Sequence, residues 1–336
     1  MGMTTPLQHD MSARDNSWER ALDAVRSTLH VPSALSTLIR GSWNESISSR
    51  DFMRLLGFPG CNSSCLLRAA EIVPVATVAN SKEVQHAVEI LGVRASAVML
   101  SINFVCQSVL DSAPPEKVWA PLLKDMMSEV EIGYHFGMSA DKLGCEYGML
   151  VGFSHWAGLA ILLGRHPREF TEWRSKNMQT PSTAAALRSF GCEGYQASSL
   201  VLQQLGFGTD VATAAVIALG DLQAGMVELK PDVELWRAAR HWIGALNNGR
   251  LYPDNELSQK TFANLMPPVM NELNQGETPL HLAMLYENIN RIRTARSSWT
   301  WHLPSDSYEK SARIVAENGR TRSYKTARPS TSLSQR

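Results

Sequence analysis

The sequence lacks an excess of charge of either sign. Over 336 residues, 32 lysines and arginines are balanced by 32 aspartates and glutamates. Nucleic-acid-binding proteins gain much of their affinity by neutralising phosphates, and they usually carry a basic excess for that purpose. We therefore expect no nucleic-acid partner, and we interpret Arg291, Arg293 and Arg296 as a solvated helix face.

Cysteine is also scarce. The five cysteines are odd in number and scattered along the chain, at Cys61, Cys65, Cys106, Cys145 and Cys192. This pattern excludes a regular disulfide framework and is typical of a reducing compartment. Cys61 and Cys65 share a helix face, but no second pair follows at the spacing of a zinc site. We expect no metal and no other cofactor.

Long apolar runs are almost missing. The most membrane-like stretch, 147–163, contains Ser154 and His155, and we interpret it as a buried core helix. Residues 1–16 are polar and have no apolar segment of the kind that opens a secretory signal. These features predict a cytoplasmic protein without membrane insertion.

Strand signals are equally rare, whereas helical periodicity is widespread. The sequence predicts a flexible tail over 1–16, with Ser17 capping the first helix, and a helical domain over 17–228. A helical extension follows over 229–303. Residues 304–336 are rich in Ser, Thr, Arg and Lys, and this composition predicts a disordered tail.

Four short motifs carry a resemblance to a known family. They are Val31-Pro32-Ser33-Ala34-Leu35, Ser48-Ser49-Arg50-Asp51-Phe52, Leu66-Leu67-Arg68-Ala69-Ala70 and Ala87-Val88-Glu89-Ile90-Leu91-Gly92. With them, the segment 30–105 resembles the N-terminal half of the HDOD family, the HD-related output domains of bacterial signalling proteins. Glu71 departs from the asparagine common in that family. The resemblance implies a bilobed, all-α fold.

The segment 118–221 is similar to the part of these domains that is related to HD phosphohydrolases. In that superfamily, histidine and aspartate side chains bind divalent metals that activate water. Under the resemblance, Pro121 stands at the first histidine, Ser154 and His155 at the His-Asp pair, and Tyr195 at a later histidine. These four candidate cleft positions lack the usual ligands, so the resemblance implies a domain without catalysis.

Three aromatic or imidazole residues have two interpretations each. His155 is either a cleft residue or a core histidine with one hydrogen-bond partner. Trp236 and Trp242 either pack their helix against the body or form an aromatic interface for a partner, since tryptophan is enriched in binding hot spots.

The expected function is signal transduction without catalysis, through contact with a signalling protein. Two alternatives stay open at this point. A nucleotide second messenger could bind in the former active-site cleft near His155 or Tyr195, or other residues could rebuild a metal-dependent phosphohydrolase.

Overall fold

The structure is a computed structural model. It describes residues 6–56, 63–72, 84–112, 114–140, 142–176, 183–220, 231–265 and 280–295. Over these ranges the chain forms helices and no strand, which confirms the all-α prediction. The helices are α1 (Pro6–Thr28), α2 (Ser33–Trp43), α3 (Ser49–Leu55), α4 (Ser64–Ile72), α5 (Val84–Leu91), α6 (Val93–Asp111), α7 (Glu116–Ser139), α8 (Cys145–Arg165), α9 (Pro167–Lys176), α10 (Thr183–Phe190), α11 (Gly194–Leu205), α12 (Thr209–Leu219), α13 (Pro231–Asn247), α14 (Glu256–Leu265) and α16 (Leu280–Ala295).

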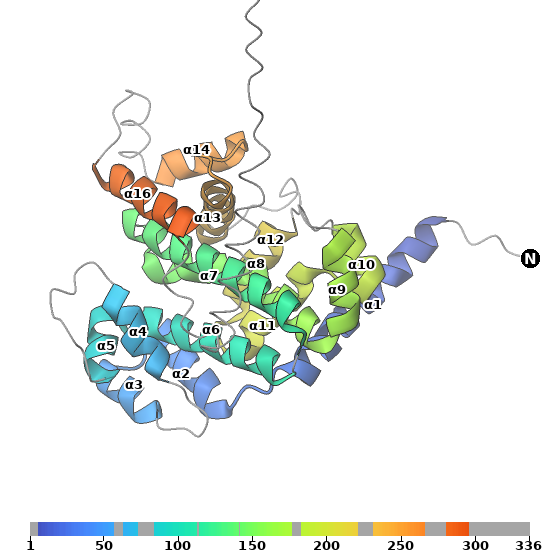
Figure 1. Ribbon diagram of the computed structural model, residues 1–336, viewed down its shortest axis with the longest axis horizontal. Helices are drawn as coiled ribbons and strands as arrows, with labels where there is room; N and C mark the ends of the chain where they lie inside the picture. Colours follow the sequence, from blue (N-terminus) through green and yellow to red (C-terminus); the bar gives the residue numbers. More distant parts are fainter. Residues whose placement is uncertain are drawn as a thin grey trace, which may run out of the picture. The chain divides into compact units, whose positions relative to one another are not determined.

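Helices α7 and α8 form the centre of the fold (Figure 1). Helices α6, α11 and α13 pack on α8, and α13 and α16 also pack on α7. Both central helices are apolar over most of their circumference. Phe136 on α7 and Phe153 on α8 are almost fully buried. A helix with apolar residues all round needs neighbours on every side, which explains its central place.

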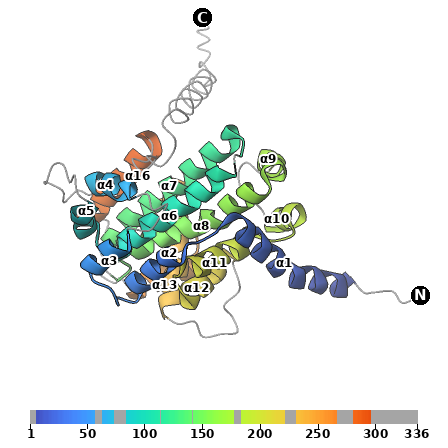
Figure 2. The same ribbon diagram turned by 90° about the horizontal axis from the view of Figure 1, so that it is seen from below.

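Helices α2 to α5 form a second group, in which α2, α4 and α5 pack on α6, whereas α1 packs on α8 and α11 (Figure 2). The start of α3 is fixed by a capping box, in which the backbone amide of Asp51 donates to Ser48 Oγ at 3.2 Å and the amide of Ser48 donates to the Asp51 carboxylate at 3.4 Å. The end of α11 is fixed by Gly206, whose left-handed φ of 109° suits glycine.

The first helix begins earlier than the sequence predicted. It starts at Pro6, a residue tolerated in a first turn, so residues 6–16 are helical and Ser17 is not its cap. Instead, Ser17 is buried inside α1 and its hydroxyl accepts a hydrogen bond from Gln196 Nε2 at 2.8 Å. A serine that can cap a helix can equally serve as a buried hydrogen-bond partner within one.

The chain divides into a unit of residues 1–302 and a unit of residues 303–336, and the second lies outside the described residues. The expected boundary at 228/229 does not separate two units, because α13 packs on α7, α8 and α12. The predicted disordered tail over 304–336 likewise lies outside the described residues.

Among the helices of the described ranges, α6 and α8 are long and apolar enough to span a membrane by length and composition alone. The chain itself buries 61% of the apolar window in α6 and 78% of that in α8. This packing is that of core helices, as we expected for residues 147–163.

Candidate functional site

The contact between α7 and α8 is set by glycine. A Cβ atom at Gly148 would lie 1.9 Å from the carbonyl oxygen of Gly133, and one at Gly152 would lie 2.4 Å from the carbonyl oxygen of Glu129. Only glycine allows two helix backbones to approach this closely. Because His155 follows Gly152 by three residues, its side chain lies on nearly the same face and reaches Glu129.

Four polar side chains meet there: Glu129 of α7, His155 of α8, and Arg240 and Asn247 of α13. We call them the Glu129 cluster. Arg240 Nη1 donates to Glu129 Oε2 at 2.7 Å and Nη2 to Oε1 at 3.3 Å, so the pair is bidentate. Asn247 Nδ2 donates to Oε1 at 3.0 Å. His155 Nδ1 lies 2.9 Å from Glu129 Oε2 and 2.7 Å from Arg240 Nη2.

The charge balance of the Glu129 cluster fixes its protonation. Burial by itself would raise the pKa of Glu129, whose side chain is only 3% exposed. The Arg240 guanidinium and the His155 ring outweigh that effect and hold the pKa of Glu129 well below its usual range. The carboxylate therefore stays ionised and paired with one permanent cation.

A second buried carboxylate lies two residues further along α7. Glu131 is fully buried, and Arg291 of α16 donates to its Oε1 from Nη2 at 3.0 Å. His135 Nε2 lies 4.0 Å from the same oxygen. Burial lowers the pKa of His135 to about 4, and Arg291 acts in the same direction against the opposing charge of Glu131. Two helices of the C-terminal extension thus each supply an arginine to α7.

The four predicted cleft positions have different neighbours. Pro121 lies inside α7 with its side chain exposed. Ser154 is buried, and its hydroxyl donates to the carbonyl oxygen of Val151 in its own helix. His155 belongs to the Glu129 cluster, and Tyr195 of α11 meets Trp18 edge-on at 6.4 Å between ring centroids. Of these contacts, those of His155 are with ionisable groups, Glu129 and Arg240.

Trp236 and Trp242 are each 2% exposed. Trp242 stacks on Phe136 at 5.9 Å between ring centroids, and Trp236 meets Tyr147 edge-on at 6.3 Å. The expectation of an exposed aromatic interface is corrected here, because both rings are enclosed by helices of the same chain. The alternative of helix packing describes them.

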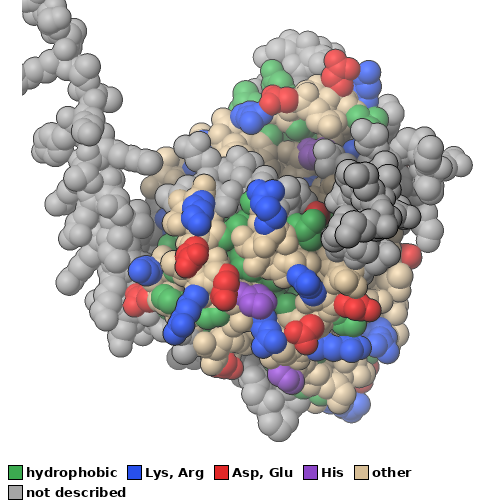
Figure 3. All heavy atoms as spheres, turned by 90° about the vertical axis from the view of Figure 1, so that its right-hand side faces the viewer, with side chains coloured by type: hydrophobic (Ala, Val, Ile, Leu, Met, Phe, Trp, Pro, Cys, Tyr) green, Lys and Arg blue, Asp and Glu red, His purple; other side chains and the backbone are tan. Residues whose placement is uncertain are grey.

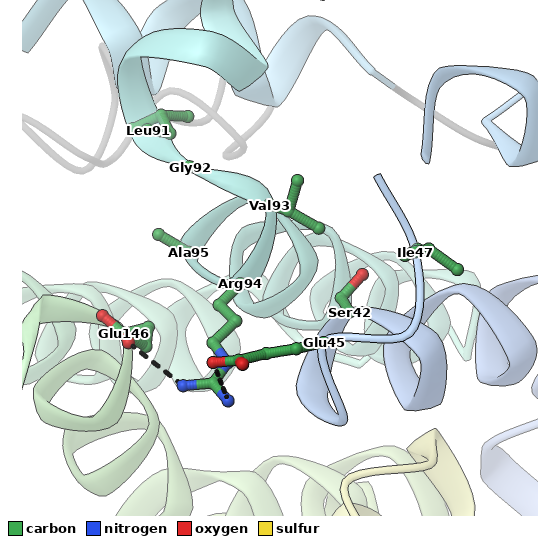
Figure 4. Close-up of a pocket in the computed structure, with 9 residues that line it drawn as sticks. All are labelled: Ser42, Glu45, Ile47, Leu91, Gly92, Val93, Arg94, Ala95 and Glu146. Carbon is green, nitrogen blue, oxygen red and sulfur yellow. Dashed lines mark ion pairs between the residues drawn. The ribbon is translucent and has the colours of Figure 1, made fainter. Parts of the chain in front are cut away.

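A cavity of about 340 Å³ lies where α2, α6 and α8 meet (Figure 4). Arg94 points into it, 2.9 Å from a carboxylate oxygen of Glu45 and 3.8 Å from one of Glu146. Its Nη2 also donates to the carbonyl oxygen of Trp43 at 3.0 Å. Because the charge of Arg94 is already paired with two carboxylates, we assign no ligand to this cavity.

Two further observations bear on ligand class. No group of three or more His, Cys, Asp and Glu side chains comes together for a metal within the described ranges. On the face of the molecule shown in Figure 3, basic and acidic side chains are interspersed and do not gather by sign. The donor set of the Glu129 cluster contains one carboxylate and one imidazole, which is fewer than a metal site usually offers.

Sequence reasoning identified His155 but missed Glu129, Arg240 and Asn247. A signal was present, because Glu129 and Glu131 interrupt an otherwise apolar stretch of α7. Acidic residues on a buried helix need partners, so they predict cations elsewhere. What the sequence does not show is which of 32 lysines and arginines supplies each one.

No protein-family model matches the chain, and no curated protein matches its sequence. Solved structures do resemble it. The structure of an HDOD domain protein of unknown function from Geobacter sulfurreducens gives a TM-score of 0.60 at 14% identity, covering 85% of this chain and 99% of that one. A "Putative phosphohydrolase" from Shewanella amazonensis SB2B gives 0.53 at 14% identity, covering 85% and 98%. Likeness at this identity establishes the fold alone. The chain therefore has an HDOD-like all-α fold.

Proposed function

We propose that this chain is a regulatory protein without catalytic activity, which relays a signal in the cytoplasm by binding another protein. The observation that carries the proposal is the bidentate Arg240–Glu129 pair beside His155. The permanently charged guanidinium of Arg240 occupies the position beside Glu129 and His155 that a divalent ion would need. The nucleophile of an HD phosphohydrolase is water activated by a bound metal ion, and a metal ion would find no pair of free ligands there.

The charges of the Glu129 cluster support the same proposal. One carboxylate and one guanidinium cancel, and His155 adds no acidic ligand. A divalent ion added to this set would leave uncompensated positive charge around a side chain that is 3% exposed, which is costly in a poorly solvated site. The HDOD-like framework remains as a helical scaffold that can present its surface to a partner.

The proposal is tested first by metal content and activity. We expect the purified full-length chain, incubated with excess Mn²⁺, Zn²⁺ or Mg²⁺ and then desalted, to retain less than one metal ion in ten molecules. We also expect no turnover of phosphomonoesters, phosphodiesters or cyclic dinucleotides. Stoichiometric metal that is lost in both Glu129→Gln and His155→Ala would overturn the proposal in favour of a phosphohydrolase.

The binding role needs a positive result of its own. We expect affinity purification from the native cells to recover a signalling protein, and the same pair to associate when both are purified. A nucleotide is the contrasting result: stabilisation of the chain by a cyclic dinucleotide, abolished in His155→Ala or Tyr195→Phe, would show a nucleotide sensor and count against the protein-binding role.

A further inference from the structure

We propose that Glu129, His155 and Asn247 form a socket that recognises a guanidinium group, and that Arg240 is its resident occupant. The ligand class follows from the shape of the contacts. Two parallel N–H donors of Arg240 meet the two oxygens of one carboxylate, at 2.7 and 3.3 Å. This is the fork geometry that a planar guanidinium forms and an ammonium group does not.

The other two members of the socket match the same ligand. His155 Nδ1 lies 2.7 Å from Arg240 Nη2 and accepts a third hydrogen bond from the guanidinium in the tautomer that carries its proton on Nε2. Asn247 donates from Nδ2 to Glu129 Oε1 at 3.0 Å, which holds the carboxylate in the orientation that the fork requires. Asn247 thus turns a donor and not an acceptor toward the site, which disfavours a bound metal ion.

The socket is deep but not sealed. Side-chain exposure rises from 3% for Glu129 and 10% for Arg240 to 33% for His155. Charge pairing is strong at the buried carboxylate because water is largely excluded. The imidazole edge provides a route from solvent, so a guanidinium supplied from outside has a way to reach the carboxylate when Arg240 is absent.

The rest of α13 does not depend on this contact. Trp242 stacks on Phe136, and Trp236 packs edge-on against Tyr147. Both rings are nearly fully buried and hold the helix against α7 and α8 by apolar contact. We therefore expect Arg240→Ala to empty the socket while α13 stays packed against α7 and α8.

The test is chemical rescue of the full-length Arg240→Ala variant. The probes are methylguanidinium and a capped tripeptide with one central arginine, which separate a free guanidinium from one presented by a polypeptide. We expect the Tm of Arg240→Ala to rise saturably, by about 3 °C at ten times the Kd of the probe that binds. Rescue by methylguanidinium alone indicates a small-molecule site, and rescue by both indicates a site that also accepts a partner's arginine.

Three controls make the result specific. Arg250→Ala removes an arginine that is paired with Asp254 at the surface, and it should show no rescue. The Arg240→Ala/Glu129→Gln double variant should show none either, because the carboxylate is gone. Methylammonium should be ineffective on Arg240→Ala. The proposal is overturned if neither probe stabilises Arg240→Ala, if Arg250→Ala responds equally, or if Mn²⁺ or Zn²⁺ stabilises Arg240→Ala more than methylguanidinium does.

If Arg240→Ala does not fold, Arg240→Lys replaces it. Lysine keeps the charge but loses the fork, so we expect the Tm of Arg240→Lys to fall by about 3 °C while that of Arg250→Lys, at the surface pair with Asp254, is unchanged. An unchanged Tm of Arg240→Lys would show that the fork is not what recognises Arg240, and would refute the socket.

Discussion

Replacing Gly148 by alanine should destabilise the fold through the contact between α7 and α8. The new Cβ would lie 1.9 Å from the carbonyl oxygen of Gly133 and 3.1 Å from the amide nitrogen of Gly137. Real Cβ contacts are at least 3.0 Å, so the helix backbones must move apart by about 1 Å at this point. Neither atom belongs to a flexible side chain that could turn away.

The expected size follows from two opposing effects. Alanine favours the helical conformation by about 1 kcal/mol relative to glycine. Overpacking usually costs about 1–3 kcal/mol, and separating two long helices also weakens dispersion contacts along both. Since backbone atoms collide, we take the upper end of that range and expect a net loss of about 2 kcal/mol in the free energy of unfolding, measured by urea denaturation followed by circular dichroism.

Gly244→Ala in α13 is the matched control. A Cβ there would lie 3.5 Å from its nearest neighbour, Arg240 Nη2, which is an ordinary van der Waals distance. The helix-propensity gain should therefore appear without a clash, and we expect this variant to be up to about 1 kcal/mol more stable than the wild type. If Gly148→Ala unfolds at the same urea concentration as Gly244→Ala, the close-contact argument is refuted.

Three further changes test the charge pairs and the helix caps. Glu129→Gln should lose about 3–5 kcal/mol in urea denaturation, because Arg240 keeps a buried charge without its carboxylate; a loss below about 1 kcal/mol would contradict this. Burial lowers the pKa of His135 to about 4, so as the pH falls the unfolded state binds a proton at this histidine before the folded state does. The free energy of unfolding should therefore fall by about 3 kcal/mol from pH 6.5 to pH 4. His135→Gln should reduce this pH dependence, and equal pH profiles in the variant and the wild type would refute the argument. Ser48→Ala removes the acceptor for the Asp51 amide and should cost about 1 kcal/mol, whereas Ser48→Asp should restore most of it; equal losses in both would show that the cap is not what matters.

The sequence predicted the helices well because the residues that begin and end a helix can be recognised from the local sequence. Gly92 ends α5 and precedes α6, and Pro115 precedes α7, as their backbone preferences require. The start of α1 was predicted wrongly for the same reason. Ser17 has the chemistry of a cap, and the local pattern does not show that its hydroxyl is used by Gln196 of α11.

The site was harder to predict because its parts come from distant segments. Arg240 and Glu129 are 111 residues apart, and periodicity gives the face of a helix but not its neighbour. A better prediction was available from the four-residue spacing of glycines in 133–137 and 144–152, which indicates two helices in backbone contact. It would have brought Gly152, and with it His155, next to α7. The tryptophans of α13 did not improve the prediction, because the local sequence does not distinguish a tryptophan buried within the fold from one at an interface.

The position of Glu129 and Glu131 on α7 suggests why the C-terminal extension belongs to the same compact unit. Residues two apart on a helix point about 200° apart, so these carboxylates face nearly opposite sides of α7. Each is buried, and each is paired with an arginine from a different helix, α13 or α16. Without those helices, two carboxylates on a central helix would lose their counter-charges. A chain ending near residue 228 would therefore need another source of cations on both sides of α7, either divalent ions or the arginines of a partner. In this chain the extension supplies them.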